Sequence, residues 1–248
     1  DGGSHDDRLA GGAGDEVIEV GTGDDRLAGG AGDVVLEGGE GDDVLAGGVG
    51  DDMLEGGDGD DVLIGGVGDD VLTGGKGEDV LVGGAGDDVL VGDAKDEMYG
   101  GAGDDIFEIG AKDFRGGAEI DGGSGEDTLL ITSGKDVAID LGHGKYDDAI
   151  EEIDNIEAID LAGAEGDVHL ALDASDVIKL TDDDHELTIF RGEGDVVDLK
   201  ETDGMEATAS DPGAELDGFT TYTYFDEAGA ILAKVHIQND DPSITGGA

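Results

Sequence analysis

A nine-residue unit, repeated ten times without insertion or deletion, dominates the first part of the chain. The unit starts first at Gly2 and last at Gly83, and it follows the consensus G-G-x-G-D-D-V-L-x. Ten copies in one phase exclude coincidence, and a repeat of this length predicts a solenoid with one short structural unit per repeat. A degenerate unit at Gly92 is one residue short, the phase resumes at Gly100, and a single copy recurs at Gly122.

The apolar positions of the unit predict short strands. The eighth position is always Leu or Ile, which favours a strand of three residues with the middle side chain buried. The six residues before it predict a turn, because glycine adopts positive φ at little cost. Stacked strands would align the eighth-position side chains in one internal column. These side chains are Leu9, Ile18, Leu27, Leu36, Leu45, Leu54, Leu63, Leu72, Leu81 and Leu90.

The charge of the chain limits its partners. Among 248 residues, 66 are acidic and 12 are basic, which gives a formal net charge of −54. Nucleic acid and anionic membrane surfaces would repel this chain, whereas cations would be attracted. No apolar run is long enough to insert into a membrane, and without cysteine there are no disulfides or thiolate metal sites. We therefore expect repeats that fold only when a cation neutralises them.

The acidic sixth position carries the chemistry of the repeat. Two units make one coil, so repeat n lies beside repeat n+2, and the sixth positions form two columns. Carboxylates at a strand spacing of roughly 4.8 Å cannot all remain ionised without a cation between them. Carboxylate and turn-carbonyl oxygens together favour Ca²⁺ over Mg²⁺ and Zn²⁺. One column contains Asp7, Asp25, Asp43, Asp61 and Asp79, and the other contains Glu16, Val34, Asp52, Asp70 and Asp88.

The most regular units resemble a known repeat. GGEGDDVLA, GGVGDDMLE, GGDGDDVLI, GGVGDDVLT, GGKGEDVLV and GGAGDDVLV look like the RTX (hemolysin-type) nonapeptide G-G-x-G-x-D-x-U-x of calcium-binding parallel β-rolls. The resemblance covers about residues 2–108 and the copy at 122–130. It implies roughly four to nine calcium ions, bound between repeats n and n+2 by turn carbonyls and sixth-position aspartates. It also implies type I secretion, with folding outside the cell.

The expected ligands are sixth-position carboxylates and the glycines of positions 2 and 4. Because Val34 has no carboxylate, we expect the Glu16/Val34 site to be vacant or weak and the Val34/Asp52 site to be compromised. The strongest sites are expected at Asp43/Asp61, Asp61/Asp79, Asp52/Asp70 and Asp70/Asp88. The complete predicted set is Asp7, Asp25, Gly39, Gly41, Asp43, Gly48, Gly50, Asp52, Gly57, Gly59, Asp61, Gly66, Gly68, Asp70, Gly75, Gly77, Asp79, Gly84, Gly86, Asp88, Asp105 and Asp127.

Other positions of the repeat have simpler interpretations. The fifth-position acids, such as Asp42 and Asp60, are expected to face solvent without a role. The seventh-position valines should face outward, where they either bind a partner or reflect β-propensity alone. Residues 220–225 (TTYTYF) predict either an aromatic platform for a ligand or a solvent-facing terminal strand. No histidine or serine lies in a recognisable catalytic motif.

The overall prediction is an all-β chain with two parts. Residues 1–108 are expected to form the β-roll, and residues 109–248 a β-rich capping domain that includes the nonapeptide at 122–130. The predicted function is a non-catalytic, calcium-induced folding module of a secreted bacterial protein, monomeric and located outside the cell or at its surface. Calcium and type I secretion machinery are the predicted partners. The alternatives are the terminal part of a ligand-binding adhesin or surface protein, or the repeat module of a secreted hydrolase or epimerase.

Overall fold

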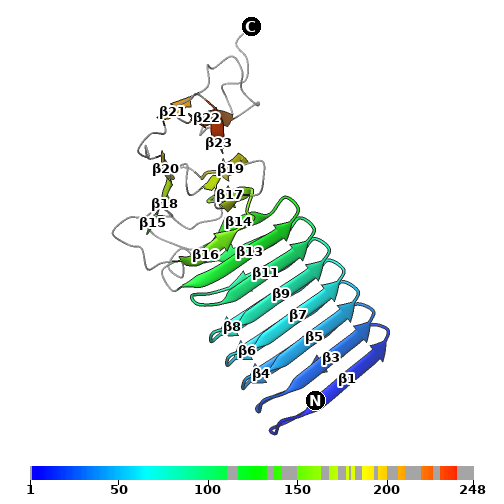
Figure 1. The fold of residues 1–248 in the computed structure, drawn as a ribbon. Helices are drawn as coiled ribbons and strands as arrows, with labels where there is room; N and C mark the ends of the chain where they lie inside the picture. The colour runs from blue at the N-terminus through cyan, green and yellow to red at the C-terminus, as the bar shows by residue number, and fades with distance from the viewer. Residues whose placement is uncertain are drawn as a thin grey trace.

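Two parallel sheets wind along the repeats and form a β-roll, the architecture that the sequence predicts (Figure 1). In this computed structural model each coil contributes one strand to each sheet, so neighbouring strands in a sheet come from repeats n and n+2. The structure describes residues 2–110, 117–132, 137–140, 150–162, 168–172, 177–178, 180–181, 186–192, 195–199, 206–209, 219–225 and 230–238.

The first sheet contains strands of alternate repeats in an unbroken order. Every pairing within it is parallel, and residues at the same position of the repeat face each other across most of its length. Its strands, in order, are β1 (Arg8–Ala13), β3 (Arg26–Ala31), β5 (Val44–Val49), β7 (Val62–Val67), β9 (Val80–Ala85), β11 (Glu97–Ala102), β13 (Ala118–Ser124) and β16 (Ile150–Asp154).

The second sheet contains the intervening repeats and extends further along the chain. It is parallel up to β23 and ends in two antiparallel pairings. Its strands, in order, are β2 (Val17–Glu19), β4 (Val35–Glu40), β6 (Met53–Asp58), β8 (Val71–Lys76), β10 (Val89–Gly92), β12 (Ile106–Ile109), β14 (Thr128–Ile131), β17 (Ala158–Asp160), β19 (Glu186–Phe190), β23 (Ile231–Gln238), β22 (Phe219–Phe225) and β21 (Glu206–Ala209). A third, smaller parallel sheet contains β15 (Val137–Asp140), β18 (Val168–Leu172) and β20 (Val196–Leu199).

The strands are longer than the sequence predicts. Most strands of the repeats span six residues, from position 7 of one unit to position 3 of the next. The prediction of three-residue strands and six-residue turns was wrong, because the glycines also pair in register, as Gly48 does with Gly66. Only positions 4 to 6 remain as the turn.

The eighth-position side chains form the core of the roll, as predicted. From Leu36 to Leu90 every one of them is at most 1% exposed, while Ile18 is 8% exposed and Leu9 is only partly buried at the N-terminal end. The column continues past the ten regular units through Met98 and Phe107. Alternation along each strand therefore points position 6 inward too, beside the core.

Strand pairing continues across residue 108. β12 spans this point and pairs with β10 on one side and β14 on the other. The separate capping domain over residues 109–248 stays a prediction. The aromatic strand 220–225 is not a terminal strand, because β22 lies between β21 and β23, and Tyr224 is fully buried in the core.

Candidate metal centre

The sixth-position aspartates form two hydrogen-bonded columns inside the turns. The Oδ1 atom of Asp61 accepts a hydrogen bond of 2.8 Å from the backbone N–H of Asp43, one coil earlier. Asp79 accepts from Asp61 in the same way, also at 2.8 Å. In the other column Asp70 accepts from the N–H of Asp52. Each carboxylate is thereby fixed in place by the coil before it.

The second oxygen of these carboxylates has no hydrogen-bond partner among the described atoms. In Asp61 and Asp70, both 1% exposed, the Oδ2 atom is buried and unpaired. A buried polar oxygen without a partner costs free energy, and a row of them with negative charge costs far more. The same holds for Oδ2 of Asp7, Asp25, Asp43, Asp52, Asp79, Asp88, Asp105 and Asp127, and for one oxygen of Glu16.

Several of the unpaired carboxylate oxygens lie near a backbone carbonyl oxygen. Both atoms approach the first glycine of a repeat. A methyl group added to Gly38 would lie 2.4 Å from Oδ2 of Asp43 and 2.6 Å from the carbonyl oxygen of Gly56. Around Gly56 the equivalent distances are 2.4 Å to Asp61 and 2.6 Å to the Gly74 carbonyl. Carboxylate and carbonyl oxygens from successive coils thus converge on one small space, which suits a cation with oxygen ligands.

The electrostatics of the columns also call for a positive charge. Burial, together with neighbouring carboxylates, raises the pKa of Asp61, Asp70 and Asp105 to about 7, although a backbone hydrogen bond to each opposes the rise. The pKa of Asp79 and Asp88 is raised to about 6 for the same main reason. A bound cation would favour the ionised form and remove this penalty.

The predicted glycines of position 2 lie near the strand ends, and those of position 4 lie in the turns. In the coil at residues 57–59, Gly57 and Gly59 have φ of +123° and +147°. A methyl group on Gly59 would lie 2.0 Å from the carbonyl oxygen of Gly41, so one coil contacts the next at this point. Whether these carbonyls also bind metal stays a prediction. The other predicted glycines, Gly39, Gly41, Gly48, Gly50, Gly66, Gly68, Gly75, Gly77, Gly84 and Gly86, likewise have positive φ.

Val34 interrupts the second column where the sequence predicts a weak site. Its side chain is 1% exposed and packs in the core. Its N–H still donates to Oδ1 of Asp52, at 2.9 Å, so the hydrogen-bonded column continues past it. The carboxylate of Glu16 lies beside Gly11 of the same repeat, and one of its oxygens is buried without a partner. The weakness of the two sites at Val34 stays a prediction.

The columns extend beyond the pattern of the regular repeats. Asp96, in the degenerate unit, accepts from the N–H of Asp79 at 3.0 Å and is fully buried. Its second oxygen accepts from Asp93, so the first column ends with a satisfied carboxylate. Sequence reasoning missed Asp96 because the unit is one residue short. The signal that could have identified Asp96 was its place after an apolar run, at the point that the phase of the neighbouring units fixes.

The fifth-position acids are exposed, as predicted, but they have a structural role. Oδ1 of Asp42 accepts a hydrogen bond of 3.0 Å from the N–H of Asp60, one coil later. Asp51 accepts from Asp69 at 3.0 Å on the other edge. These bonds run in the opposite direction to those of the sixth position. A regular turn with a coil on either side is consequently bonded to both of them.

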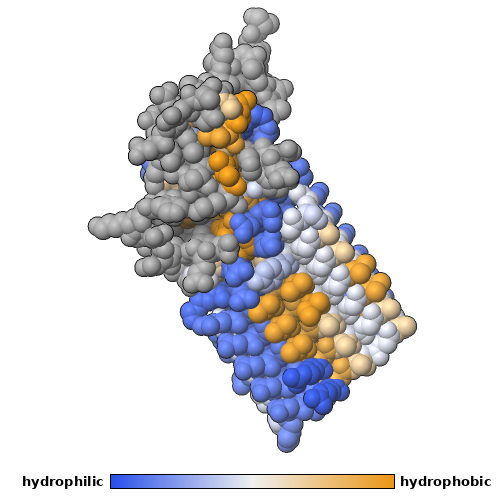
Figure 2. Space-filling view, in the orientation of Figure 1, coloured by the Kyte–Doolittle hydropathy of each residue, from blue (hydrophilic) through white to orange (hydrophobic). Residues whose placement is uncertain are grey.

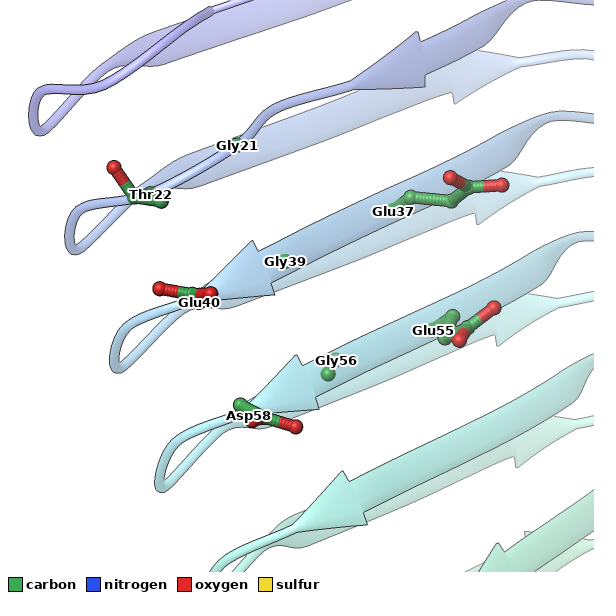
Figure 3. A pocket seen from close by; sticks show the side chains of 9 residues that line it. Gly21, Thr22, Glu37, Gly39, Glu40, Glu55, Gly56 and Asp58 are labelled. Atoms are coloured by element: carbon green, nitrogen blue, oxygen red, sulfur yellow. The ribbon is translucent and has the colours of Figure 1, made fainter.

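The exposed acids of the second sheet differ from the buried columns. A hollow on its outer face is lined by Glu37 and Glu55 on β4 and β6, with Glu40 and Asp58 at the strand ends (Figure 3). Solvent reaches these side chains, so they carry no unpaired buried oxygen. Within the described part of the chain, no three acidic or histidine side chains alone are placed to hold a metal. A site in the turns therefore needs backbone carbonyls.

Taken together, parallel coils and two columns of buried, half-satisfied carboxylates define a metal-binding β-roll. Residues 1–111 match the RTX calcium-binding nonapeptide repeat in four copies, at residues 1–36, 19–54, 55–90 and 91–111. This part of the chain is an RTX repeat region, calcium is the metal that such repeats bind, and β-rolls of this kind are typically non-catalytic. No curated protein matches the chain. No helix of the described residues is long and apolar enough to cross a membrane.

Proposed function

We propose that the β-roll is a calcium-controlled folding module of a protein exported by type I secretion and folded outside the cell. The observation that carries this proposal is the row of buried, unpaired carboxylate oxygens in each column. Without a cation, these oxygens repel one another in a poorly solvated space. The unfolded chain, in which water hydrates them, is then the favoured state.

Residues of the turns and of the adjoining strands would hold calcium and link it to folding. The oxygens come from two coils. One is Oδ2 of a sixth-position aspartate, such as Asp61, and the other is the backbone carbonyl oxygen of a first-position glycine in the next coil, such as Gly74. Calcium, when bound, supplies the positive charge that these oxygens lack. Because no such set of oxygens exists in the unfolded chain, the free energy of binding becomes free energy of folding.

Export in the unfolded state requires a weak calcium affinity. Cytosolic calcium sensors respond at roughly 10⁻⁷–10⁻⁵ M, whereas extracellular calcium modules respond at roughly 10⁻⁴–10⁻³ M. We propose that this roll belongs to the second range, so that the chain stays unfolded inside the cell. The location outside the cell follows from the same argument.

Far-UV circular dichroism of the metal-free chain during a calcium titration tests the proposal, with magnesium as the control. We expect a cooperative gain of β signal with calcium alone, half complete at roughly 10⁻⁴–10⁻³ M. A fully folded spectrum in excess chelator would contradict calcium-controlled folding. A half-saturation below the micromolar range would leave calcium control intact but contradict export in the unfolded state.

A further inference from the structure

The outer face of the first sheet is apolar along the middle of the roll. Ile64 and Val67 on β7 are 41% and 55% exposed, and Val49 on β5 is 55% exposed. Figure 2 shows this patch in orange over β5, β7 and β9. The outer face of the second sheet also has exposed apolar side chains, such as Met53, but it carries Glu37 and Glu55 beside them (Figure 3). The two outer faces of the roll therefore differ in charge.

Charged residues of opposite sign lie at the two ends of this apolar face. Arg8 and Arg26 project from β1 and β3, and Glu97 and Glu119 project from β11 and β13. All belong to one column of seventh-position side chains, held in register by consecutive strand pairings. The column reads Arg8, Arg26, Val44, Val62, Val80, Glu97 and Glu119. The two positive and the two negative side chains lie at equal numbers of strands from Val62, on opposite sides of it.

Each end of the column holds two like charges directly opposite each other. Arg8 pairs with Arg26 across β1 and β3, and Glu97 with Glu119 across β11 and β13. Such pairs are destabilising within a sheet. The Tyr99 hydroxyl donates to Glu119 at 3.0 Å and lies 3.4 Å from Glu97. Among the described residues, neither arginine has an ion-pair partner.

We propose that this face binds a second copy of the chain in a two-fold symmetric dimer. The axis lies between the two faces, parallel to β7, so that β1 of one copy faces β13 of the other. Val62 then meets Val62 at the centre. Arg8 and Arg26 of each copy meet Glu119 and Glu97 of the other, and both like-charge pairs gain opposite charges. The surface is complementary to itself, as a two-fold interface requires.

The size of the face is sufficient for such a dimer. Seven strands about 4.8 Å apart, with six residues of about 3.3 Å each, cover about 30 by 20 Å. Two such faces would bury about 1,200 Å² in total, the lower end of the range for specific protein interfaces. The apolar middle of the face, on β5, β7 and β9, is a contiguous exposed patch (Figure 2) of the kind that often marks an interaction site. The proposal requires the folded roll but not its export.

A charge-swap experiment with the full chain in saturating calcium tests this dimer. Sedimentation equilibrium should give twice the monomer mass of 24.9 kDa. Arg8→Glu/Arg26→Glu and Glu97→Arg/Glu119→Arg should each weaken dimerisation at least about tenfold, because like charges then meet. An equimolar mixture of these two variants should form a heterodimer, since every contact between them is again opposite in charge.

Two further variants separate the interface from a general effect on folding. Val62→Lys places two like charges at the symmetry axis and should give a monomer. Met53→Lys makes the same change at the seventh position of the second sheet, where Met53 is 52% exposed, and should remain a dimer. Calcium-induced circular dichroism must match the wild type in each variant compared. A monomeric wild type, or failure of the mixture to associate, would overturn the proposal.

Discussion

Each sixth-position aspartate uses its two carboxylate oxygens differently. In Asp70, Oδ1 accepts the N–H of Asp52 at 2.8 Å, whereas Oδ2 is buried without a partner. The first oxygen is satisfied by the protein, and the second needs a cation or a proton. An asparagine in place of the aspartate keeps the hydrogen bond that Oδ1 accepts but removes the negative charge that would bind a cation. This substitution therefore isolates the contribution of the charge.

We expect Asp70→Asn to weaken calcium-induced folding, because Asp70 borders two proposed sites. The calcium midpoint should rise at least about threefold, and fewer ions should bind, since one carboxylate ligand contributes to both sites. Circular dichroism gives the midpoint and equilibrium dialysis the number of ions. Asp69→Asn is the matched control, because Asp69 is exposed and keeps an oxygen for the N–H of Asp87. Equal effects of both changes would contradict a special role for the column.

Glycine at the first position leaves space for the oxygens rather than allowing an unusual backbone. We expect Gly56→Ala to abolish calcium binding in its turn, because the new methyl group would lie 2.4 Å from Oδ2 of Asp61. Gly12→Ala is the control, since nothing lies within 4 Å of a methyl group there. Calorimetric titration should show fewer ions for Gly56→Ala only. Unchanged stoichiometry in Gly56→Ala would place the ions elsewhere.

At the scale of the elements, the column is the unit that binds. Val34 is the one apolar residue at the sixth position of the ten regular repeats. Its neighbour Asp52 accepts its N–H, so the column is intact on the Asp52 side. On the other side the valine removes one negative charge and one hydrogen-bond acceptor from the column.

We expect Val34→Asp to add calcium binding at this point. With calcium, the variant should bind at least one more ion and unfold at a higher temperature than the wild type. Without calcium it should be less stable, because another charge joins a buried column. Equilibrium dialysis and thermal unfolding measure both effects. Val35→Asp, on the outer face, should bind no additional ion, and the same gain in both variants would contradict the argument.

The column also determines how the metal-free roll responds to pH. In the folded state the pKa of Asp61 and Asp70 is raised to about 7, and that of Asp79 to about 6, from the ordinary value of 3.8. A raised folded-state pKa contributes stability that is fully present below pH 3.8 and is lost as the pH rises through 6 to 7. The metal-free roll is therefore stabilised by acid.

We expect the chain freed of metal to gain β structure when the pH falls from 7.5 to about 5. Protons then take the place of the cation at the unpaired oxygens. With saturating calcium the roll should already be folded at pH 7.5, and acidification should release the ions. Circular dichroism with and without calcium follows both reactions. Loss of β signal on acidification of the metal-free chain would contradict the raised pKa values.

Sequence and structure agree for features that depend on a single position of the repeat. The eighth-position column and the two carboxylate columns were predictable from phase alone, because a fixed repeat places identical residues in register. The six-residue strands were not, since glycine usually indicates a turn, and pairing such as Gly48 with Gly66 appears only when coils stack. Asp96 and the hydrogen bond accepted by Asp42 also depend on neighbouring coils.

At the scale of the whole molecule, the charge dominates. The net charge is −54, and even nine calcium ions would supply only 18 positive charges, one third of it. The calcium-bound protein therefore remains strongly acidic. Self-repulsion should keep the metal-free chain expanded, whereas the folded coils hold their buried carboxylates within a narrow stack.

We expect calcium to reduce the radius of gyration by about half. An unfolded chain of this length has a radius of about 55 Å, and a folded one is far more compact. Small-angle X-ray scattering at low protein concentration measures the change, with magnesium as the control. An equal contraction in magnesium or in sodium chloride of the same ionic strength would indicate simple screening.

The opposed hydrogen bonds of the fifth and sixth positions have a mechanical consequence. Each interior turn is tied to both neighbouring coils, so the contacts lie in series and every contact carries the whole of a force applied along the stack. A detached coil of 18 residues extends to about 60 Å, although it occupied only about 4.8 Å of the stack. Under tension the roll would therefore lengthen in discrete steps, with one coil unfolding in each step.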